Sequence, residues 1–270
     1  MTSPDTPPLL LCIGGHDPSG GAGIQADAEA ARAAGAHATS VITCLTTQDT
    51  CGLRRLYPQP AELVDEQCRL LLGDSSIGAI KVGLIGSSRI ARSLASLAAE
   101  HSHLPLVLDP VLASGAGESV TDAALLNQLR TNLLAHCSLI TPNLPEAQAL
   151  AGGGTDPEAC ARRLLSTGCS WVLITGTHEA RDDVVNRLFG RDGTHREWTW
   201  PRLPHSYHGS GCTLASAIAA RLALGMELVE AVAEAQGYTW ASLHRAWRTG
   251  RCQYLPNRLY ALDDKPTDQP

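Results

Sequence analysis

The chain has 270 residues, of which 44% are apolar and 18% charged, and its formal net charge is −6. This composition is typical of a globular protein with a large apolar core and argues against a disordered chain. The acidic balance and the lack of Lys/Arg runs exclude a broad basic surface for nucleic acid, and no apolar stretch approaches the roughly 20 residues of a membrane span. Residues 1–8 lack the pattern of a signal peptide, so we expect a cytoplasmic protein with neither nucleic acid nor membrane as a partner.

The nine cysteines are scattered along the chain, and no CxxC pair occurs. This spacing does not match a zinc site. We therefore expect most of the cysteines to be small buried apolar residues in a reducing compartment. Cys212 is the exception, because it falls at the predicted start of a helix.

Short apolar runs alternate with amphipathic segments along the chain. The apolar runs predict strands at residues 9–14, 40–45, 78–82, 106–108, 138–140 and 171–174. The amphipathic or Ala-rich segments predict helices at residues 24–34, 61–72, 88–99, 123–134, 145–151, 157–166, 211–224 and 227–247. Residues 184–189 and 195–200 flank Arg191-Asp192-Gly193, which is the pattern of a β-hairpin.

This alternation predicts an α/β fold of three layers, with a central, mostly parallel sheet and helices on both faces. We expect a single domain over residues 9–260, with flexible tails at 1–8 and 261–270. Sheets of this kind bind ligands beyond the carboxyl ends of their strands. The informative loops are therefore residues 14–23, 45–52, 109–117, 141–146, 175–178 and 205–213.

The segment 208–213 reads His-Gly-Ser-Gly-Cys-Thr and leads into an Ala-rich helix. Glycines let the backbone turn its N–H groups toward a ligand, and a helix start attracts negative charge. We predict that Gly209, Ser210 and Gly211 bind an oxygen of a transferring phosphoryl group. A helix start also lowers the pKa of a thiol, which makes Cys212 a candidate base for a substrate hydroxyl. The alternative is a plain turn in which Ser210 or Thr213 caps the helix and Cys212 is structural.

Two further loops carry groups that suit phosphate and Mg²⁺. Asp109 closes one predicted strand, and Asn143 and Glu146 follow the next, three residues apart on one face of a helix start. Because Mg²⁺ takes one or two carboxylates and keeps several waters, Asp109 and Glu146 are candidate ligands. The alternative is a helix cap at Asn143 with Glu146 favourable to the helix dipole. The chain has no GxxxxGK[ST] sequence, which excludes a P-loop enzyme.

The Gly-rich loop at residues 14–23 permits close approach of the backbone to a ligand, and Asp17 and Asp27 place carboxylates near that approach. Its spacing does not match the GxGxxG of a dinucleotide fold. Gln48 follows the second predicted strand, and its amide offers a donor and an acceptor to a planar heterocycle. Each of these side chains also has a plainer interpretation: Asp17 as a turn cap, Asp27 as a solvated helix residue and Gln48 as a loop residue.

Six motifs occur in one order along the chain. They are Gly15-His-Asp-Pro-Ser-Gly-Gly-Ala-Gly-Ile-Gln-Ala-Asp27, Val41-Ile-Thr-Cys-Leu-Thr-Thr-Gln48, Lys81-Val-Gly-Leu-Ile-Gly86, Val107-Leu-Asp-Pro-Val111, Ile140-Thr-Pro-Asn-Leu-Pro-Glu-Ala147 and His208-Gly-Ser-Gly-Cys-Thr213. Together, over roughly residues 9 to 245, they resemble the hydroxymethylpyrimidine/phosphomethylpyrimidine kinases of thiamine biosynthesis, within the ribokinase-like superfamily. Each motif alone is weak, and the ordered set is specific.

The resemblance implies a ribokinase-like fold and an ATP- and Mg²⁺-dependent kinase. Its substrates would be 4-amino-5-hydroxymethyl-2-methylpyrimidine and the monophosphate of that alcohol, which becomes the diphosphate. It also implies that Gln48 pairs with the pyrimidine, while Gly15 and Asp27 line its pocket. Cys212 stands where the sugar kinases of the superfamily carry an aspartate base, and the amides of residues 209–212 form the anion hole. Family members are commonly dimers, so a homodimer is expected. The resemblance places these residues on the ATP and phosphate side: Asp109, Asn143, Glu146 and Thr175.

Three features depart from the family pattern. Thr175 stands where the family usually has a lysine before Gly-Gly-His, residues 203–207 lack the usual Asp/Lys-rich sequence, and residues 249–259 replace a Gly-x-Gly ending. Because of these departures, the resemblance does not determine how the nucleotide is bound or how the site is covered. Two other functions also stay open, namely pyridoxal or pyridoxine phosphorylation and a non-catalytic, pyrimidine-binding regulatory role. Asn143, Glu146 and Cys212 argue against the regulatory role, because binding alone does not require them.

Overall fold

The computed structural model describes residues 6–113, 120–154, 156–179 and 181–263. Within these ranges the chain forms one sheet in the order β3-β2-β1-β4-β5-β6-β7-β8-β9. Its parallel strands are β1 (Leu9–His16), β2 (His37–Asp49), β4 (Ile77–Val82), β5 (Leu106–Leu108), β6 (Leu139–Ile140) and β7 (Trp171–Ile174). Strands β3 (Gly52–Pro58), β8 (Asp183–Gly190) and β9 (His195–Pro201) are antiparallel to their neighbours at the two edges.

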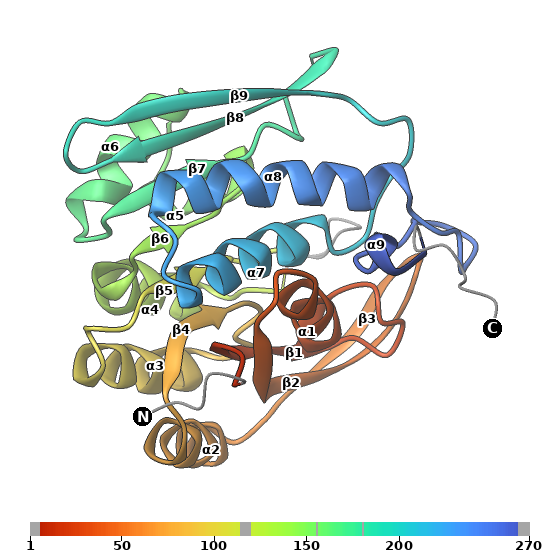
Figure 1. The fold of residues 1–270 in the computed structure, drawn as a ribbon. Coiled ribbons are helices and arrows are strands. Elements are labelled where there is room, and N and C mark those ends of the chain that lie inside the picture. The colour runs from red at the N-terminus through yellow and green to blue at the C-terminus, as the bar shows by residue number, and fades with distance from the viewer. Residues whose placement is uncertain (1–5, 114–119, 155, 180, 264–270) are drawn as a thin grey trace, which may run out of the picture.

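Helices cover both faces of the sheet (Figure 1). Helices α1 (Gly23–Ala33), α7 (Ser210–Ala223) and α8 (Leu228–His244) pack on one face. On the other face lie α2 (Ala61–Asp74), α3 (Ser88–Glu100), α4 (Ala123–Gln128), α5 (Leu144–Ala151) and α6 (Pro157–Ser166). A short helix, α9 (Tyr260–Asp263), ends the described chain. The predicted three-layer α/β fold is confirmed. No helix of the described ranges combines the length and apolarity needed to cross a bilayer.

The first strand shows how the sequence builds two separate cores. Side chains of a strand alternate between its faces, so neighbouring apolar residues serve opposite layers. Leu10 and Cys12 belong to the core beneath α1, α7 and α8, whereas Leu11 and Ile13 belong to the core beneath α2 to α6. All four side chains are fully buried. The continuous apolar run at this strand thus reflects helices on both sides of the sheet.

Helix α7 lies unusually close to the sheet because its buried face is largely alanine. At Gly78 of β4, an added Cβ would come within 2.9 Å of the Ala223 carbonyl oxygen at the end of α7. The small side chains and this glycine allow the helix to be held tightly against the strands. As a result, the start of α7 has a fixed position relative to the carboxyl ends of the central strands.

Three segments differ from the sequence expectations. Residues 45–52 are not a loop but the end of β2, a turn and the start of β3, so Gln48 lies within a strand. The helix expected at 123–134 is α4 followed by a π-helical turn, Leu129–Leu133, and a 3-10 turn, Leu134–His136. The last long helix ends at His244 rather than at residue 247. Parts of the loop expected at 109–117 and of both expected tails lie outside the described residues.

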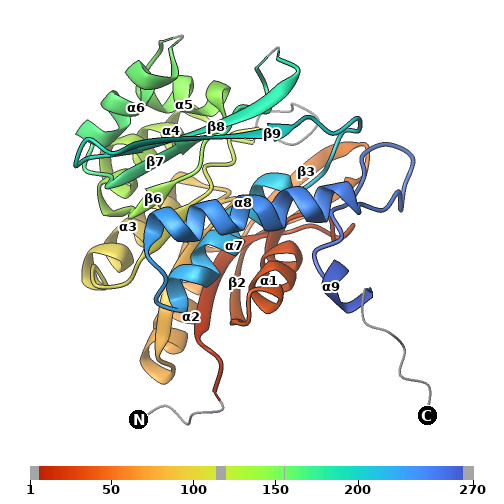
Figure 2. The same ribbon diagram turned by 45° about the horizontal axis from the view of Figure 1, so that its top comes forward.

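Two cysteines depart from the expectation of unpaired residues. Cys51, in the turn between β2 and β3, forms a disulfide with Cys252, which is 201 residues away in the segment after α8. Figure 2 shows this C-terminal segment, in blue, reaching the tip of β3. The six cysteines that are buried and free confirm the expectation; they are Cys12, Cys44, Cys68, Cys137, Cys160 and Cys169. The expectation is wrong for the disulfide pair, since both residues are exposed at the surface rather than packed in a core.

Candidate active site

A cavity of about 910 Å³ opens where the carboxyl ends of the parallel strands meet the start of α7. Segments far apart in the sequence converge there, as expected for a sheet of this kind. All but one of the predicted site residues line it: Gly15, Gln48, Asp109, Asn143, Glu146, Thr175, Gly209, Ser210, Gly211 and Cys212. Asp27 is the exception.

The start of α7 presents backbone N–H groups to the cavity. Its N-cap is Gly209, whose φ of 79° is left-handed, and no side chain caps this helix start. An added Cβ at Gly209 would lie 1.9 Å from the Gly21 carbonyl oxygen, so only glycine fits there. The Thr213 hydroxyl instead donates to the Gly209 carbonyl over 2.7 Å. The interpretation as a turn capped by Ser210 or Thr213 is therefore wrong, and the helix start is available to an anion.

A buried ion pair lies behind the wall of the cavity. Lys81 Nζ donates to Asp27 Oδ1 over 2.7 Å, both side chains are almost completely buried, and the Ser216 hydroxyl donates to the same oxygen. Lys81 lines the cavity, whereas Asp27 does not. The other oxygen, Asp27 Oδ2, has no hydrogen-bond partner among the described residues. Asp27 lies on the face of α1 that packs against the sheet, so it does not reach the cavity. It instead binds the Lys81 ammonium group, and Lys81 lines the cavity.

Cys212 lies in the first turn of α7 beside Lys81 and Asp109. Burial raises the pKa of its thiol to about 12, and the neighbouring charge of Lys81 offsets only part of this effect. The charge of the nearby Asp109 carboxylate raises the thiol pKa further, and the Gly23 N–H lowers it. The expectation of a lowered thiol pKa is therefore wrong, because removal from water outweighs the effect of the helix start.

Two carboxylates, Asp109 and Glu146, line the cavity together near the start of α7. Burial raises the pKa of Asp109 to about 6, and burial together with the charge of Asp109 raises the pKa of Glu146 to about 8. Asn143 and Glu146 form a reciprocal capping box at the start of α5, with hydrogen bonds of 2.9 and 3.0 Å. The capping interpretation is thus confirmed, and both side chains line the cavity as well.

This carboxylate pair fits a divalent cation that keeps part of its water shell. Raised pKa values show that two negative charges are unfavourable there, and a cation would relieve both. No group of three or more His, Cys, Asp or Glu residues in the described ranges could hold a metal by itself. Two carboxylates, with the remaining positions left to water and phosphate, are the donor set that Mg²⁺ takes in nucleotide sites.

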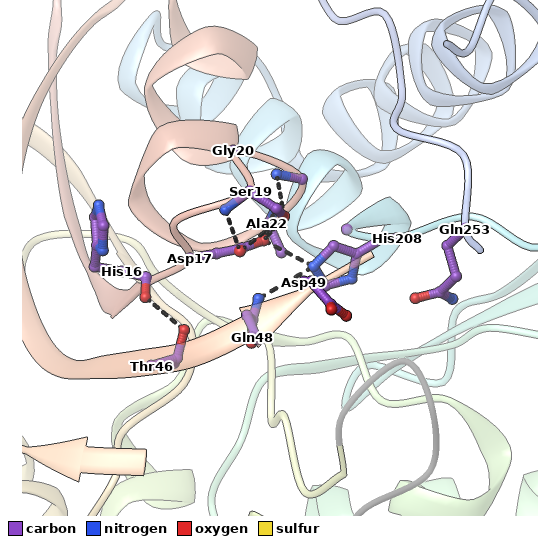
Figure 3. Close-up of polar contacts among 12 residues, drawn as sticks. His16, Asp17, Ser19, Gly20, Ala22, Thr46, Gln48, Asp49, His208 and Gln253 are labelled. Carbon is purple, nitrogen blue, oxygen red and sulfur yellow. Dashed lines mark hydrogen bonds and ion pairs between the residues drawn. The ribbon is translucent and has the colours of Figure 1, made fainter. Parts of the chain in front are cut away.

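Gln48 lines the cavity next to His208, a histidine with no role predicted from the sequence (Figure 3). His208 Nε2 lies 2.7 Å from Asp17 Oδ2 and 3.2 Å from Gln48 Nε2. Asp17 also accepts the N–H groups of Ser19 and Ala22, so its interpretation as a turn cap is confirmed. The missed signal was the position of His208, directly before the glycine that opens the anion site.

Thr175 lines the cavity at the position where the resemblance led us to expect a lysine. The Thr175 N–H donates to the Pro142 carbonyl over 3.0 Å, which continues the pairing of β6 and β7 to the cavity. Arg202 also lines the cavity, but its guanidinium donates to backbone carbonyls of residues 177–183. Beyond it, the Trp200 indole donates to Gln236 Oε1, and both side chains form the wall at this end.

The unusual C-terminal segment braces the site. The Tyr254 carbonyl accepts the His208 N–H over 2.9 Å, and Tyr254 N–H donates to the Ser206 carbonyl. Arg258, almost fully buried, donates to the Gly21 carbonyl and, over 2.8 Å, to the Thr213 hydroxyl. The segment thus joins the Gly-rich loop after β1 to the start of α7, in place of the Gly-x-Gly ending that the sequence lacks.

Comparison with known sequences gives one consistent result. A family model described as phosphomethylpyrimidine kinase matches residues 17–257. The hydroxymethylpyrimidine/phosphomethylpyrimidine kinase of Streptomyces coelicolor is 38% identical over 255 residues, which cover 92% of this chain and 93% of that protein.

Solved structures show the same likeness. The phosphomethylpyrimidine kinase of Clostridium difficile superposes with a TM-score of 0.75 at 31% identity, covering 86% of this chain and 97% of that one. The pyridoxal kinase of Staphylococcus aureus, solved in complex with AMP-PCP and pyridoxal, has a TM-score of 0.83 at 25% identity, with 93% of each chain covered.

Proposed function

Because this chain belongs to the phosphomethylpyrimidine kinase family, we propose that it transfers phosphate from ATP to 4-amino-5-hydroxymethyl-2-methylpyrimidine and then to the monophosphate of that alcohol. The product would be the diphosphate used in thiamine biosynthesis. One observation carries the proposal: a single cavity joins an uncapped helix start, two carboxylates and an amide suited to a heterocycle. No other feature of the described residues brings these three groups together.

Substrate recognition in this proposal starts from Gln48. Its amide presents a donor and an acceptor side by side, which matches the ring nitrogen and exocyclic amino group of an aminopyrimidine. Gly15 forms the floor beside it, where an added Cβ would approach the Leu84 side chain to 2.9 Å. Because no side chain fits there, the Gly15 backbone itself lines the cavity, and a flat ring can lie against it.

Phosphoryl transfer takes place at the start of α7, where the N–H groups of residues 210–212 meet the developing charge on the phosphoryl oxygens. Cys212 enters the reaction as a thiol next to Asp109. As the sulfur accepts the proton of the substrate hydroxyl, its own proton passes to an Asp109 oxygen, so Asp109 would face the cation only through water. Lys81 stays charged next to Cys212 and Asp109. Burial opposes its charge, but the charge of Asp27 helps to outweigh burial, so the pKa of Lys81 rises.

ATP and Mg²⁺ belong to the same proposal. Asp109 and Glu146 would hold the cation, partly through water, and Asn143 and Thr175 lie beside them on the phosphate side. When bound, Mg²⁺ neutralises charge on the ATP phosphates. Glu146 must lose its proton to serve as a ligand, so cation binding should release protons near neutral pH.

Pyridoxal phosphorylation is the second candidate, favoured by the likeness to the S. aureus enzyme. A coupled assay of ADP release, run with the pyrimidine alcohol and with pyridoxal, separates the two. We expect kcat/KM for the pyrimidine to exceed that for pyridoxal by at least about 10-fold, equivalent to about 1.4 kcal/mol. A preference for pyridoxal would replace the proposed substrate, and binding of the pyrimidine without ADP release would indicate the non-catalytic regulatory protein instead.

A homodimer and a cytoplasmic location complete the proposal. The support for the dimer is the family resemblance alone, and sedimentation equilibrium of the purified chain tests it: a mass near twice 28.5 kDa is expected, and a mass of one chain would overturn it. Fractionation of the source cells tests the location.

A further inference from the structure

His208 lies between Gln48 and the start of α7. Its contacts with Asp17 and Gln48 determine which of these side chains carries the shared proton. Its Nε2 lies between Asp17 Oδ2, at 2.7 Å, and the side-chain amide of Gln48, at 3.2 Å (Figure 3). The imidazole is mostly buried and the Asp17 carboxylate almost completely so. Both His208 and Gln48 line the cavity, and Asp17 lines it beside them.

The surroundings of Asp17 require a carboxylate without a proton. Its two oxygens already accept the N–H of Ser19, the N–H of Ala22 and the Ser19 hydroxyl, at 2.8 to 2.9 Å. Burial opposes this charge, but the hydrogen bonds from His208 and Ser19 outweigh burial and keep the pKa of Asp17 well below its usual range. An ionised carboxylate can only accept, so the hydrogen between Asp17 and His208 must reside on Nε2.

A protonated Nε2 then determines how Gln48 is turned. A protonated Nε2 has no lone pair to accept an amide N–H, so the amide atom 3.2 Å away must be an oxygen, which shares the single Nε2–H with Asp17. The oxygen and nitrogen of a glutamine amide exchange places by a half-turn of the group, and the hydrogen-bond network decides between the two arrangements. Here the network selects Oε1 toward His208, which leaves the NH₂ group directed at the ligand.

We infer that Asp17 and His208 are positioning residues that fix the Gln48 amide in one orientation, with Oε1 on the side of His208 and NH₂ facing a ring nitrogen. This inference rests on the proposed function and specifies how its substrate is oriented. Oε1 has two lone pairs, one for His208 and one for the exocyclic amino group of the pyrimidine. The site therefore selects a ring edge that carries an acceptor next to a donor.

The orientation of the amide also sets the orientation of the ring. In the proposed substrate the amino group and the hydroxymethyl group are on adjacent carbons. Placing the amino group at Oε1 thus turns the hydroxymethyl group toward His208 and the anion site that follows it at Gly209. The backbone there is fixed, because the His208 N–H is held by Tyr254 and no side chain fits at Gly209. A single histidine thus links recognition of the ring to the place of transfer.

The proton position can be measured without any turnover. We propose two-dimensional ¹H–¹⁵N NMR of the full-length protein labelled at histidine nitrogens, with His208→Phe used to assign the signal. At pH 7.5 the His208 Nε2 should carry a proton, and adding the pyrimidine alcohol should leave it in place. A bare Nε2 with its proton on Nδ1 would overturn the inference even if the protein proves to be an active kinase.

Kinetics of His208→Phe give the second test. The variant removes the donor and keeps a ring, so the amide of Gln48 is free to turn. We expect KM for the pyrimidine alcohol to rise roughly 10- to 100-fold, as for the loss of a charge-assisted hydrogen bond, with KM for ATP changed less than about 3-fold. His195→Phe, on the β8–β9 hairpin where His195 stacks on Phe189, controls for removal of a surface histidine and should change neither value.

The results separate the two claims. A wild-type protein that phosphorylates the pyrimidine, with His208→Phe showing an unchanged KM for it, would overturn the positioning role alone. Loss of thermal stability in His208→Phe would leave the NMR measurement on the wild-type protein as the deciding test. A wild-type protein that makes no phosphorylated pyrimidine would overturn the proposed function, while the protonation of Nε2 would still decide the orientation of Gln48.

Discussion

At the scale of single residues, the proposed reaction assigns proton acceptance to one group and charge stabilisation to others. Cys212 holds its proton at neutral pH, since burial raises the pKa of its thiol to about 12. Phosphoryl transfer through a loose transition state needs little help from a base. In the proposed reaction the backbone amides at the start of α7 act directly on the transferring group, so they should matter more than the thiol.

This ranking can be tested with two substitutions. Cys212→Ala should lower kcat by roughly 10-fold, below the usual range for a general base, because little negative charge builds on the attacking oxygen. Gly211→Val should lower kcat by roughly 100- to 1,000-fold, as for a lost oxyanion donor. An added Cβ at Gly211 would lie 3.5 Å from Asp109 Oδ2, so the valine methyls would fill the space of the phosphoryl group. Near-normal turnover of Gly211→Val, with thermal unfolding unchanged, would refute the anion site.

The buried ion pair between Lys81 and Asp27 allows a separate prediction about the free energy of unfolding. Removing the cation in Lys81→Met leaves Asp27 buried, charged and without an ion-pair partner, at a cost of roughly 3–5 kcal/mol in the free energy of unfolding. The double variant Asp27→Asn/Lys81→Met should recover part of this loss, because the uncompensated charge is gone. Urea unfolding of the three proteins measures the difference. A single variant as stable as the wild type would show that the ion pair does not hold this wall of the cavity.

At the scale of elements, the segment after α8 acts as a brace that the sequence did not reveal. It is tied to the β2–β3 turn by the Cys51–Cys252 disulfide and to the His208 backbone through Tyr254. In addition, Gln253 N–H donates to the Thr50 carbonyl. The brace therefore holds the substrate end of the cavity from outside the sheet.

Reduction of the disulfide should loosen this brace. The bond closes a very long loop, so its removal should lower the free energy of unfolding by roughly 2–4 kcal/mol and Tm by several degrees. Differential scanning calorimetry with and without dithiothreitol measures the shift. The double variant Cys51→Ser/Cys252→Ser serves as control, since dithiothreitol should not change its Tm. An equal response of both proteins, or none in the wild type, would contradict the brace.

Most helices and strands could be predicted from the sequence, but the brace formed by the segment after α8 could not. Apolar runs and helical spacing located the sheet strands and their helices because burial on both faces leaves a strong pattern. A strand was predicted at residues 40–45 within β2, but its extension to Asp49 and the strand β3 were missed, since β3 carries no clear apolar alternation; Arg54 and Arg55, for example, are both exposed. The boundary of α4 was misplaced, because a π-helical turn keeps the same residue pattern as an α-helix.

The same limit applies to the site. Residues at strand ends and the helix start were found because their place in a parallel sheet predicts convergence. Asp27 was misplaced, since the choice between lining a cavity and supporting a lysine depends on which side of α1 faces the strands. Lys81, His208 and Arg258 went unassigned because each acts through a partner more than 40 residues away in the chain.

At the scale of the whole molecule, the carboxylate pair should make stability depend on pH. The pKa values of Asp109 and Glu146 are raised to about 6 and about 8 in the folded protein, above those of the unfolded chain. The folded state thus binds more protons than the unfolded chain. The contribution of the two protonated carboxyls to the free energy of unfolding is complete below about pH 4, and it is lost as pH rises through the pKa of Asp109, about 6, and that of Glu146, about 8. Asp17, whose pKa is lowered, acts only below that window.

We therefore expect Tm of the ligand-free protein to fall by several degrees between pH 5.5 and pH 8.5. Glu146→Gln should flatten this slope, because the residue no longer ionises. MgCl₂ should raise Tm more at pH 8.5 than at pH 5.5, with NaCl of equal ionic strength as control. A Tm that rises with pH over this range, or a magnesium effect that is equal at both values, would contradict the carboxylate pair as the cation site.

Product analysis tests the central claim most directly. The purified protein is incubated with 4-amino-5-hydroxymethyl-2-methylpyrimidine, ATP and MgCl₂, and the pyrimidine pool is followed by mass spectrometry. Our account predicts that the mass of one phosphate appears first and that of a second phosphate follows, with Gly211→Val forming neither at a comparable rate. An unchanged pyrimidine after ATP has been supplied in excess, from protein shown to be folded, would contradict it.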